Sequence, residues 1–316
     1  METFYFREGD DLFFQKQIKL LSSGTVEEKI SAIYNLRAVR AKRALRPMIL
    51  ALKGVSSLTA KQTNTQTQEI NPTGDYASVN FDLKQNNLPV VKYLAAQALA
   101  EIRQESAIKP LVEVYKELEE TLTKKKNQRV FFEKFEEMNE VNAAAEVLRS
   151  IGTLLSDFED KEAQELINNA LKHEHFLIRS AAAEALANTD NDSAIPTLDA
   201  ASSTEKNDYA KACMHASVVD IRKTNTKHFF ELIKMLKSED QSTRFKVSSL
   251  LGLLAIENSE TYIRQAMMIE DSVNVKNQMK KDIVLITTYE VPNAPSASYG
   301  TEVDRNKKSD TKVNPK

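Results

Sequence analysis

The stretch IRSAAAEALANTDNDSAIPTLDAA, residues 178–201, decides the fold, because it places two helix-forming segments around one polar break. Its first half is apolar and rich in alanine, which is the best helix former and has a small side chain. The Asn, Asp and Ser residues of the break are typical of turns and helix N-termini. Its second half begins Ala-Ile-Pro, and a helix tolerates proline in its first turn. The stretch therefore predicts two antiparallel helices joined by a short turn.

The alanine-rich half recurs along the chain. Six segments align on a central apolar residue: EKISAIYNLRAV, VKYLAAQALAEI, VNAAAEVLRSIG, IRSAAAEALANT, AKACMHASVVDI and TRFKVSSLLGLL. Their central residues are Leu36, Leu99, Leu148, Leu186, Val218 and Leu251, and the last three intervals are 38, 32 and 33 residues. A period of this length indicates a repeat protein built from helix pairs.

Each repeat continues with a second, more amphipathic segment. In the segment at 107–115, Ile108, Leu111, Val112 and Tyr115 fall at the i, i+3, i+4 and i+7 positions of one helical stripe. Prolines stand near the start of three such segments, at Pro47, Pro110 and Pro196. The pattern predicts a return helix after every alanine-rich helix.

The composition supports an all-α chain. Only 7 of the 316 residues are glycine and 8 are proline, which is few for a protein with many tight turns. The single cysteine excludes an internal disulfide framework. The 43 basic and 45 acidic side chains nearly cancel, which disfavours a dedicated nucleic-acid-binding protein.

These motifs resemble those of HEAT-repeat proteins, of the short-repeat type also found in phycobilisome-lyase-like domains. The Val-Arg or Val-Lys dipeptide of the family corresponds to Val91-Lys92 and Ile178-Arg179, and its Ala-Ile-x-Pro-Leu motif to residues 107–111. Two return segments, at 163–171 and 227–236, lack the proline. The resemblance implies a right-handed α-solenoid of about six antiparallel helix pairs, an armadillo-type superhelix.

The expected organisation has three parts. Residues 1–24 form an N-terminal cap, residues 25–287 form the solenoid, and residues 288–316 form a disordered tail. Within the solenoid, the polar residues 54–87 are expected to be a disordered insertion. Residues from about 111 to 153 are expected to form an extended helical hairpin, whose second arm, 128–153, would be about 40 Å long.

Two basic clusters are candidate partner-binding sites. The first comprises Arg37, Arg40, Lys42, Arg43 and Arg46, and the second comprises Lys124, Lys125, Lys126 and Arg129 at the expected hairpin tip. Such clusters attract acidic proteins, phosphate or nucleic acid. They can also cap helix C-termini and cover apolar neighbours, or be simply solvated.

Phe131 and Phe132 are a third candidate. Adjacent aromatic residues on a helix do not both face one narrow seam, so one of them is expected to contact a partner protein or the insertion 54–87.

No residue pattern indicates catalysis or a metal. His173 and His175 stand two positions apart, and on a helix such side chains do not face one ion. The same spacing separates Cys213 from His215, so Cys213 is expected to be a buried small apolar residue. The segment NTDNDS lacks the glycine and glutamate of a calcium loop, and we expect it to serve as a turn and helix cap.

The sequence therefore predicts a non-enzymatic scaffold or adaptor that needs no cofactor. We expect it to bind another protein through its inner face, formed by the return helices, and through the hairpin. The alternatives are nucleic-acid-backbone binding through the basic clusters and, with less support, a phycobilin-lyase-like enzyme. The N-terminus shows no signal-peptide pattern and no apolar run is long enough for a membrane span, so a cytoplasmic location is expected.

Overall fold

The computed structural model describes residues 11–39, 42–54, 88–124, 137–224 and 226–289. Within these ranges it contains fourteen α-helices. They are α1 (Asp11–Ser23), α2 (Val26–Ala38), α3 (Leu45–Lys53), α5 (Pro89–Ile102), α6 (Ile108–Lys124), α7 (Glu140–Leu155), α8 (Lys161–Ala170), α9 (Phe176–Asn188), α10 (Ile195–Thr204), α11 (Asp208–Arg222), α12 (Lys227–Met235), α13 (Gln241–Leu254), α14 (Ser259–Ile269) and α15 (Val273–Tyr289).

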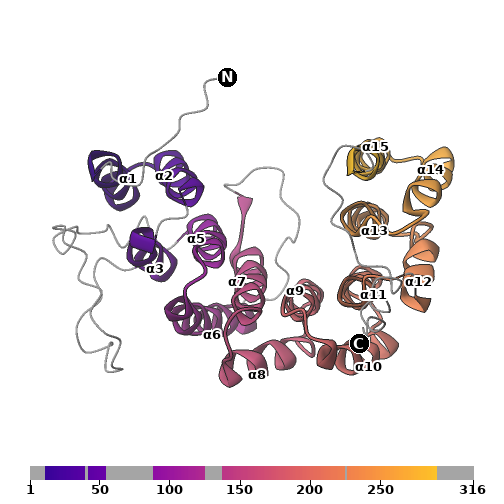
Figure 1. Cartoon of the computed structure of the whole chain (residues 1–316), viewed down its shortest axis with the longest axis horizontal. Coiled ribbons are helices and arrows are strands. Elements are labelled where there is room, and N and C mark those ends of the chain that lie inside the picture. Colours follow the sequence, from indigo (N-terminus) through magenta and orange to yellow (C-terminus); the bar gives the residue numbers. More distant parts are fainter. Residues whose placement is uncertain (1–10, 40–41, 55–87, 125–136, 225, 290–316) are drawn as a thin grey trace, which may run out of the picture.

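The helices stack in two rows that follow the order of the chain (Figure 1). The alanine-rich helices α2, α5, α7, α9, α11 and α13 form one row, which α15 completes, and each packs on the next. The return helices α3, α6, α8, α10, α12 and α14 form the second row. The expectation of an all-α solenoid of about six antiparallel helix pairs is confirmed.

The alanine-rich row lies on the inside of the curve, so we call it the inner row (Figure 1). The prediction that the return helices line the inner face is therefore wrong. The physical reason is the size of the side chains between neighbouring helices. Ala95, Ala144 and Ala182 are completely buried in the inner row, where they allow close approach of the helices. The bulkier return helices are spaced further apart, and the row with the shorter spacing becomes the concave side.

Gly152 marks a close approach of two helices within this row. A Cβ atom on this residue of α7 would lie 2.6 Å from Cα of Ala185 in α9. Real side-chain carbons essentially never come so close to backbone. Glycine is therefore required here for the two helices to touch.

The polar breaks act as turns and caps, as predicted. In the NTDNDS segment, the side chain of Asn191 accepts a hydrogen bond of 2.9 Å from the backbone N–H of Ser193 and caps a short 3-10 helix, Asp192–Ala194. Similar 3-10 turns precede α3 and α6, at Lys42–Ala44 and Glu105–Ala107. Each of these turns delivers a proline into the first turn of the return helix that follows.

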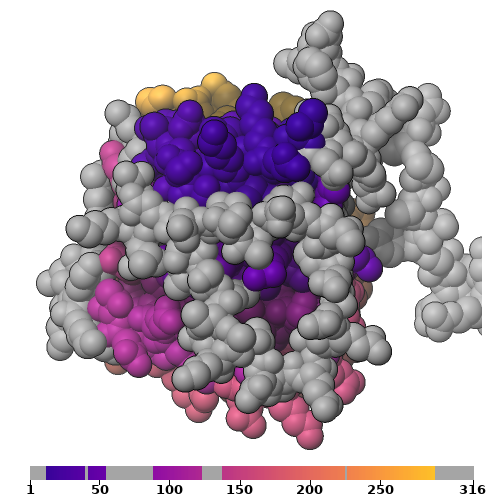
Figure 2. All heavy atoms as spheres, turned by 90° about the vertical axis from the view of Figure 1, so that its left-hand side faces the viewer, coloured from indigo at the N-terminus to yellow at the C-terminus, as the bar shows by residue number. Residues whose placement is uncertain are grey.

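Both ends of the stack are covered by an extra helix. α1 packs on α2 and α3 through Phe14, Ile18 and Leu21, and Figure 2 shows the surface of this N-terminal end in indigo. At the other end α15 packs on α13 and α14. In this contact the hydroxyl of Ser248 donates a 2.6 Å hydrogen bond to Oδ2 of Asp282. One helix thus lies within residues 1–24, for which the sequence predicted an N-terminal cap, and another ends the described part of the stack.

The expected long hairpin is described only in part. Its first arm is α6, but α7 begins at Glu140 rather than near residue 128. The reason is Asn139, whose side chain accepts hydrogen bonds from the N–H groups of Val141 and Asn142 and caps the helix. The rest of the predicted tip, residues 125–136, lies outside the described residues, as do the insertion at 55–87 and the tail from 290 onwards.

No helix in the described part of the chain combines the length and apolarity that crossing a membrane requires.

Candidate functional site

The residues of the first predicted basic cluster lie in different environments. Arg37, at the C-terminal end of α2, places Nη2 2.5 Å from Oε1 of Glu101 in α5. Its Nη1 also donates a 2.7 Å hydrogen bond to Oε1 of Gln97. The hydrogen bond to Glu101 raises the pKa of Arg37, although burial opposes this. Arg37 therefore fastens two helices of the inner row together.

The other members of this cluster point elsewhere. The guanidinium carbon of Arg43 lies 3.8 Å above the centre of the Phe14 ring, which joins the cap helix α1 to the first repeat. Lys42 and Arg46 are exposed. Arg40 lies outside the described residues. The cluster thus leaves two of its described cations, Lys42 and Arg46, exposed near one turn.

The second predicted cluster and the aromatic pair stay predictions. Lys124 is the last residue of α6, but its side chain lies outside the described part, together with Lys125, Lys126, Arg129, Phe131 and Phe132.

The structure reveals a different cluster, at the centre of the inner row, which we call the inner cluster: Arg149 of α7, Glu184 of α9 and Lys246 of α13. The Nζ atom of Lys246 lies 2.7 Å from Oε1 of Glu184, while Nε of Arg149 contacts the other oxygen of the same carboxylate. Nη1 of Arg149 also lies 3.3 Å from Oε2 of Glu146 on the same helix. One carboxylate is therefore held between cations from two other helices.

This arrangement depends on the small residues of α11. Helix α11 lies between α9 and α13 in the row, and its buried residues Cys213, Ala216 and Ser217 line the hollow where Lys246 passes over this helix. A large side chain there would separate Lys246 from Glu184. The small side chains leave instead a hollow of about 380 Å³, the inner hollow. Its lining consists of Arg149, Glu184, Ala187, Asn188, Cys213, Ala216, Ser217, Asp220, Lys246, Leu250, Leu253 and Leu254.

The charges of the inner cluster stabilise one another. Burial alone would raise the pKa of Glu184, but Arg149 and Lys246 together lower it to about 2. Burial likewise opposes ionisation of Lys246, and the facing carboxylate outweighs it and raises the pKa of this amine. All three side chains are thus ionised at neutral pH.

Cys213 has none of the properties of a nucleophile. It is completely buried, and burial raises the pKa of its thiol to about 12. His215 does not face it but lies against His228, with the two Nδ1 atoms 2.9 Å apart. Cys213 therefore serves as a small buried residue, as its spacing from His215 predicted.

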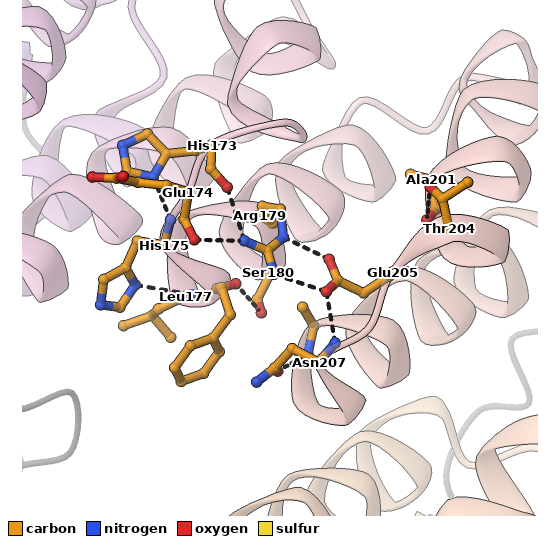
Figure 3. A network of polar contacts seen from close by, with 12 residues as sticks. His173, Glu174, His175, Leu177, Arg179, Ser180, Ala201, Thr204, Glu205 and Asn207 are labelled. Atoms are coloured by element: carbon orange, nitrogen blue, oxygen red, sulfur yellow. Dashed lines mark hydrogen bonds and ion pairs between the residues drawn. The ribbon is translucent and has the colours of Figure 1, made fainter.

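A second hollow, of about 920 Å³, lies on the outer side between α8 and α10. Arg179, the basic residue of the repeat motif, lines this hollow. Figure 3 shows its polar contacts. Its Nε and Nη2 atoms contact both carboxylate oxygens of Glu205, at 2.5 and 2.7 Å. Its Nη1 donates to the carbonyl oxygens of His173 and Glu174, at 2.8 and 2.9 Å.

The same contacts recur two repeats further along the solenoid, at α13. Arg244 binds Glu270 through Nε and Nη2, at 2.7 and 2.9 Å, and its Nη1 donates to the carbonyl oxygens of Ser238 and Glu239. Each arginine thus joins the turn before its helix to a glutamate 26 residues later. The basic residue of the motif has a structural role at these two positions, and it stabilises the connection between successive pairs.

The two histidines of this outer region accept hydrogen bonds within the turn that precedes α9. Nδ1 of His173 accepts a 2.9 Å hydrogen bond from the N–H of His175, whose own Nδ1 accepts from the N–H of Leu177 and caps α9. Burial lowers the pKa of both rings. Within the described residues no group of three or more His, Cys, Asp or Glu side chains is placed to hold a metal ion.

The inner cluster was not among the sites predicted from the sequence. Glu184 and Glu146 both stand two positions before the central leucine of their repeats, which is a detectable signal. Lys246 stands where the preceding repeat has Cys213. That Lys246 reaches over α11 to a repeat two steps away follows only from the curvature.

Comparisons with known proteins agree with the repeats seen in the structure. A model of HEAT repeats matches residues 133–216, and a model of the PBS lyase HEAT-like repeat matches residues 91–117. No curated protein sequence matches the chain. Two solved structures are similar in outline. The first is the complex of CpcE and CpcF of phycocyanin lyase from Nostoc sp. PCC7120, at 15% identity and a TM-score of 0.45, over 90% of this chain and 99% of that one. The second is an engineered protein, at 18% identity and a TM-score of 0.31, over 87% and 96% of the two chains.

The family models thus cover most of α5, part of α6, all of α7, α8, α9 and α10, and part of α11. Together with helix pairs that stack in chain order, these matches show that the chain contains HEAT repeats.

Proposed function

We propose that this protein is a non-enzymatic scaffold that binds another protein along the concave face of its inner row. The observation that carries the proposal is the combination, on this face, of internally paired charges with an open, partly apolar hollow. Leu253 projects from α13 with 71% of its surface exposed, next to the hollow lined by Ala216 and Leu250. An exposed apolar residue beside such a hollow is typical of a protein contact.

The pairing of charges argues for a protein partner. Arg37, Arg149 and Lys246 each face a carboxylate across the row. Cations engaged in this way contribute little to binding phosphates, which depends on free Lys and Arg side chains. A protein surface, by contrast, is bound by burying apolar groups and by local hydrogen bonds.

Capture from extracts of the source cell tests the proposal. The exposed Asn188 of α9 lines the inner hollow, and the exposed Asn169 of α8 lies in the outer row. We expect Asn188→Arg to reduce the recovery of a specific partner at least tenfold and the matched control Asn169→Arg to leave it unchanged. Equal recovery with both variants, or capture of nucleic acid in place of protein, would contradict the proposal.

A further inference from the structure

We propose that the inner hollow continues over one edge of the solenoid as a groove for an extended segment of a partner protein, with a large apolar side chain followed by basic ones. This inference rests on the proposed scaffold function and specifies the chemistry of the partner.

The groove consists of two hollows that share neighbouring residues. One is the inner hollow. The other has a volume of about 670 Å³ and lies between the C-terminal ends of α7, α9 and α11, and we call it the acidic hollow. Asn188 lines the inner hollow and the next residue, Thr189, lines the acidic one. In the same way Asp220 lines the first and Ile221 the second. The two hollows therefore lie next to each other at two helices, α9 and α11.

The inner hollow is suited to an apolar side chain. Ala187, Ala216, Leu250, Leu253 and Leu254 supply its apolar lining. Its volume of about 380 Å³ exceeds the roughly 150 Å³ that accommodates benzene in an engineered apolar cavity. A leucine or an aromatic ring therefore fits together with its backbone.

The acidic hollow is suited to basic side chains. Its lining includes four carboxylates and no basic residue: Asp157, Glu159, Asp190 and Asp192. Asp157 has a partner, Arg103, at 2.8 Å, but both side chains are partly exposed, so this pair is weak. The C-terminal ends of α7 and α9 add the negative end of their helix dipoles. A lysine or arginine is attracted here, whereas a phosphate group is repelled.

Selection of peptides on the full-length protein tests the groove. A display library of random 12-residue peptides is selected against the immobilised chain at physiological salt. We expect the recovered peptides to contain a leucine, isoleucine or aromatic residue, followed within about five positions by at least two Lys or Arg. The affinity of a synthetic peptide of this kind should fall as salt rises, because its basic part binds at an exposed surface.

Two pairs of matched variants locate the binding. Leu253→Ser, in the inner hollow, should weaken the peptide at least fivefold, and Met268→Ser, which changes a residue of α14 that is 81% exposed, should not. Asp190→Lys combined with Asp192→Lys should weaken it at least tenfold, whereas Glu165→Lys combined with Glu174→Lys should not. All of these side chains are exposed, so the changes do not disturb buried packing.

Two results would overturn the proposed groove. The first is recovery of acidic or uncharged peptides, and the second is peptide binding that neither groove variant changes. Dimerisation that the double lysine variant abolishes would assign the groove to a second copy of this chain. Competition by a peptide of residues 290–316 would assign it to the C-terminal segment of the chain itself. If a partner still binds the inner face in any of these cases, the scaffold function stands and only the groove fails.

Discussion

Lys246 of α13 forms an ion pair with Glu184 of α9, across the intervening helix α11, with 2.7 Å between Nζ and Oε1. The pair therefore links repeats that are not neighbours. Most contacts in a solenoid join adjacent repeats only. Arg149 of α7 contacts the other oxygen of the same carboxylate, so one side chain connects three helices of the inner row. The curvature of this region and the shape of the inner hollow are thereby linked.

A double-mutant cycle measures this link. Glu184→Gln leaves two partly buried cations without their carboxylate, and we expect it to lower the free energy of unfolding by about 2–4 kcal/mol. Lys246→Met leaves Arg149 beside Glu184 and should cost about 1–2 kcal/mol. The coupling energy between the two changes, from urea unfolding followed by circular dichroism, should be about 1 kcal/mol or more. Additive effects within about 0.5 kcal/mol would show that the two residues do not interact.

Gly152→Ala tests the close packing of α7 against α9. The added carbon would lie 2.6 Å from Cα of Ala185, so the helices must separate. We expect a loss of at least about 2 kcal/mol of unfolding free energy, in contrast to the gain expected for Gly→Ala in an unhindered helix. Thermal unfolding measures the effect, with Ser203→Ala in the exposed part of α10 as the control. A stabilised Gly152→Ala variant would contradict the close contact.

The buried histidine pair predicts a loss of stability in acid. Burial, assisted by His228, lowers the pKa of His215 to about 4, and burial also lowers that of His228, although Asp199 opposes it. Because these folded-state pKa values lie below the ordinary value of 6.5, the unfolded chain binds more protons. Their contribution is therefore complete above about pH 6.5 and is lost as pH falls toward 4.

We expect the free energy of unfolding to fall by about 1–2 kcal/mol from this pair between pH 7 and pH 5. The variant His215→Gln should flatten that slope in urea titrations at each pH. Its half-buried relative His173 has Glu119 and Glu174 nearby, which oppose the lowering of its pKa, so His173→Gln is expected to change the slope less. An unchanged slope in His215→Gln would refute the assignment.

The arginine clamps predict a difference between arginine and lysine. The Glu205 side chain is only 4% exposed, so Arg179→Met leaves a buried carboxylate without its bidentate partner and should cost about 3 kcal/mol. Arg179→Lys keeps the charge but loses the bidentate contact, and we expect it to lower the free energy of unfolding by about 1–2 kcal/mol. The exposed Arg264, paired with Glu260 on its own helix, gives the control Arg264→Lys, with less than about 0.5 kcal/mol. Equal effects at Arg179 and Arg264 would argue against the clamp.

The sequence predicted the repeating parts of the fold more accurately than their arrangement. Turn chemistry at NTDNDS and the small size of Ala95 and Ala182 are local properties, so the helix pairs could be read directly. Which row of helices lies on the concave side depends on the difference in helix spacing between the two rows. For that reason the inner face was assigned to the return helices in error, although the alanines that decide it were already visible.

The candidate site was harder to predict for the same reason. Arg37 stood out because it belongs to a basic run, yet its partners Gln97 and Glu101 lie 60 and 64 positions away. Glu184 and Lys246 stand out in no local pattern. They meet because α11 is narrow at Ala216, and that is a property of three packed helices rather than of any one segment.

Site-specific photo-cross-linking tests the central claim, that partners bind the concave face of the inner row, most directly. A photoreactive phenylalanine analogue replaces either Leu253 on the inner face or Met268 on α14 of the outer row, two residues of similar exposure at 71% and 81%. Irradiation in extracts of the source cell should yield a discrete cross-linked protein from position 253 and none from position 268. The same product from both positions, or a product from position 268 alone, would contradict the claim.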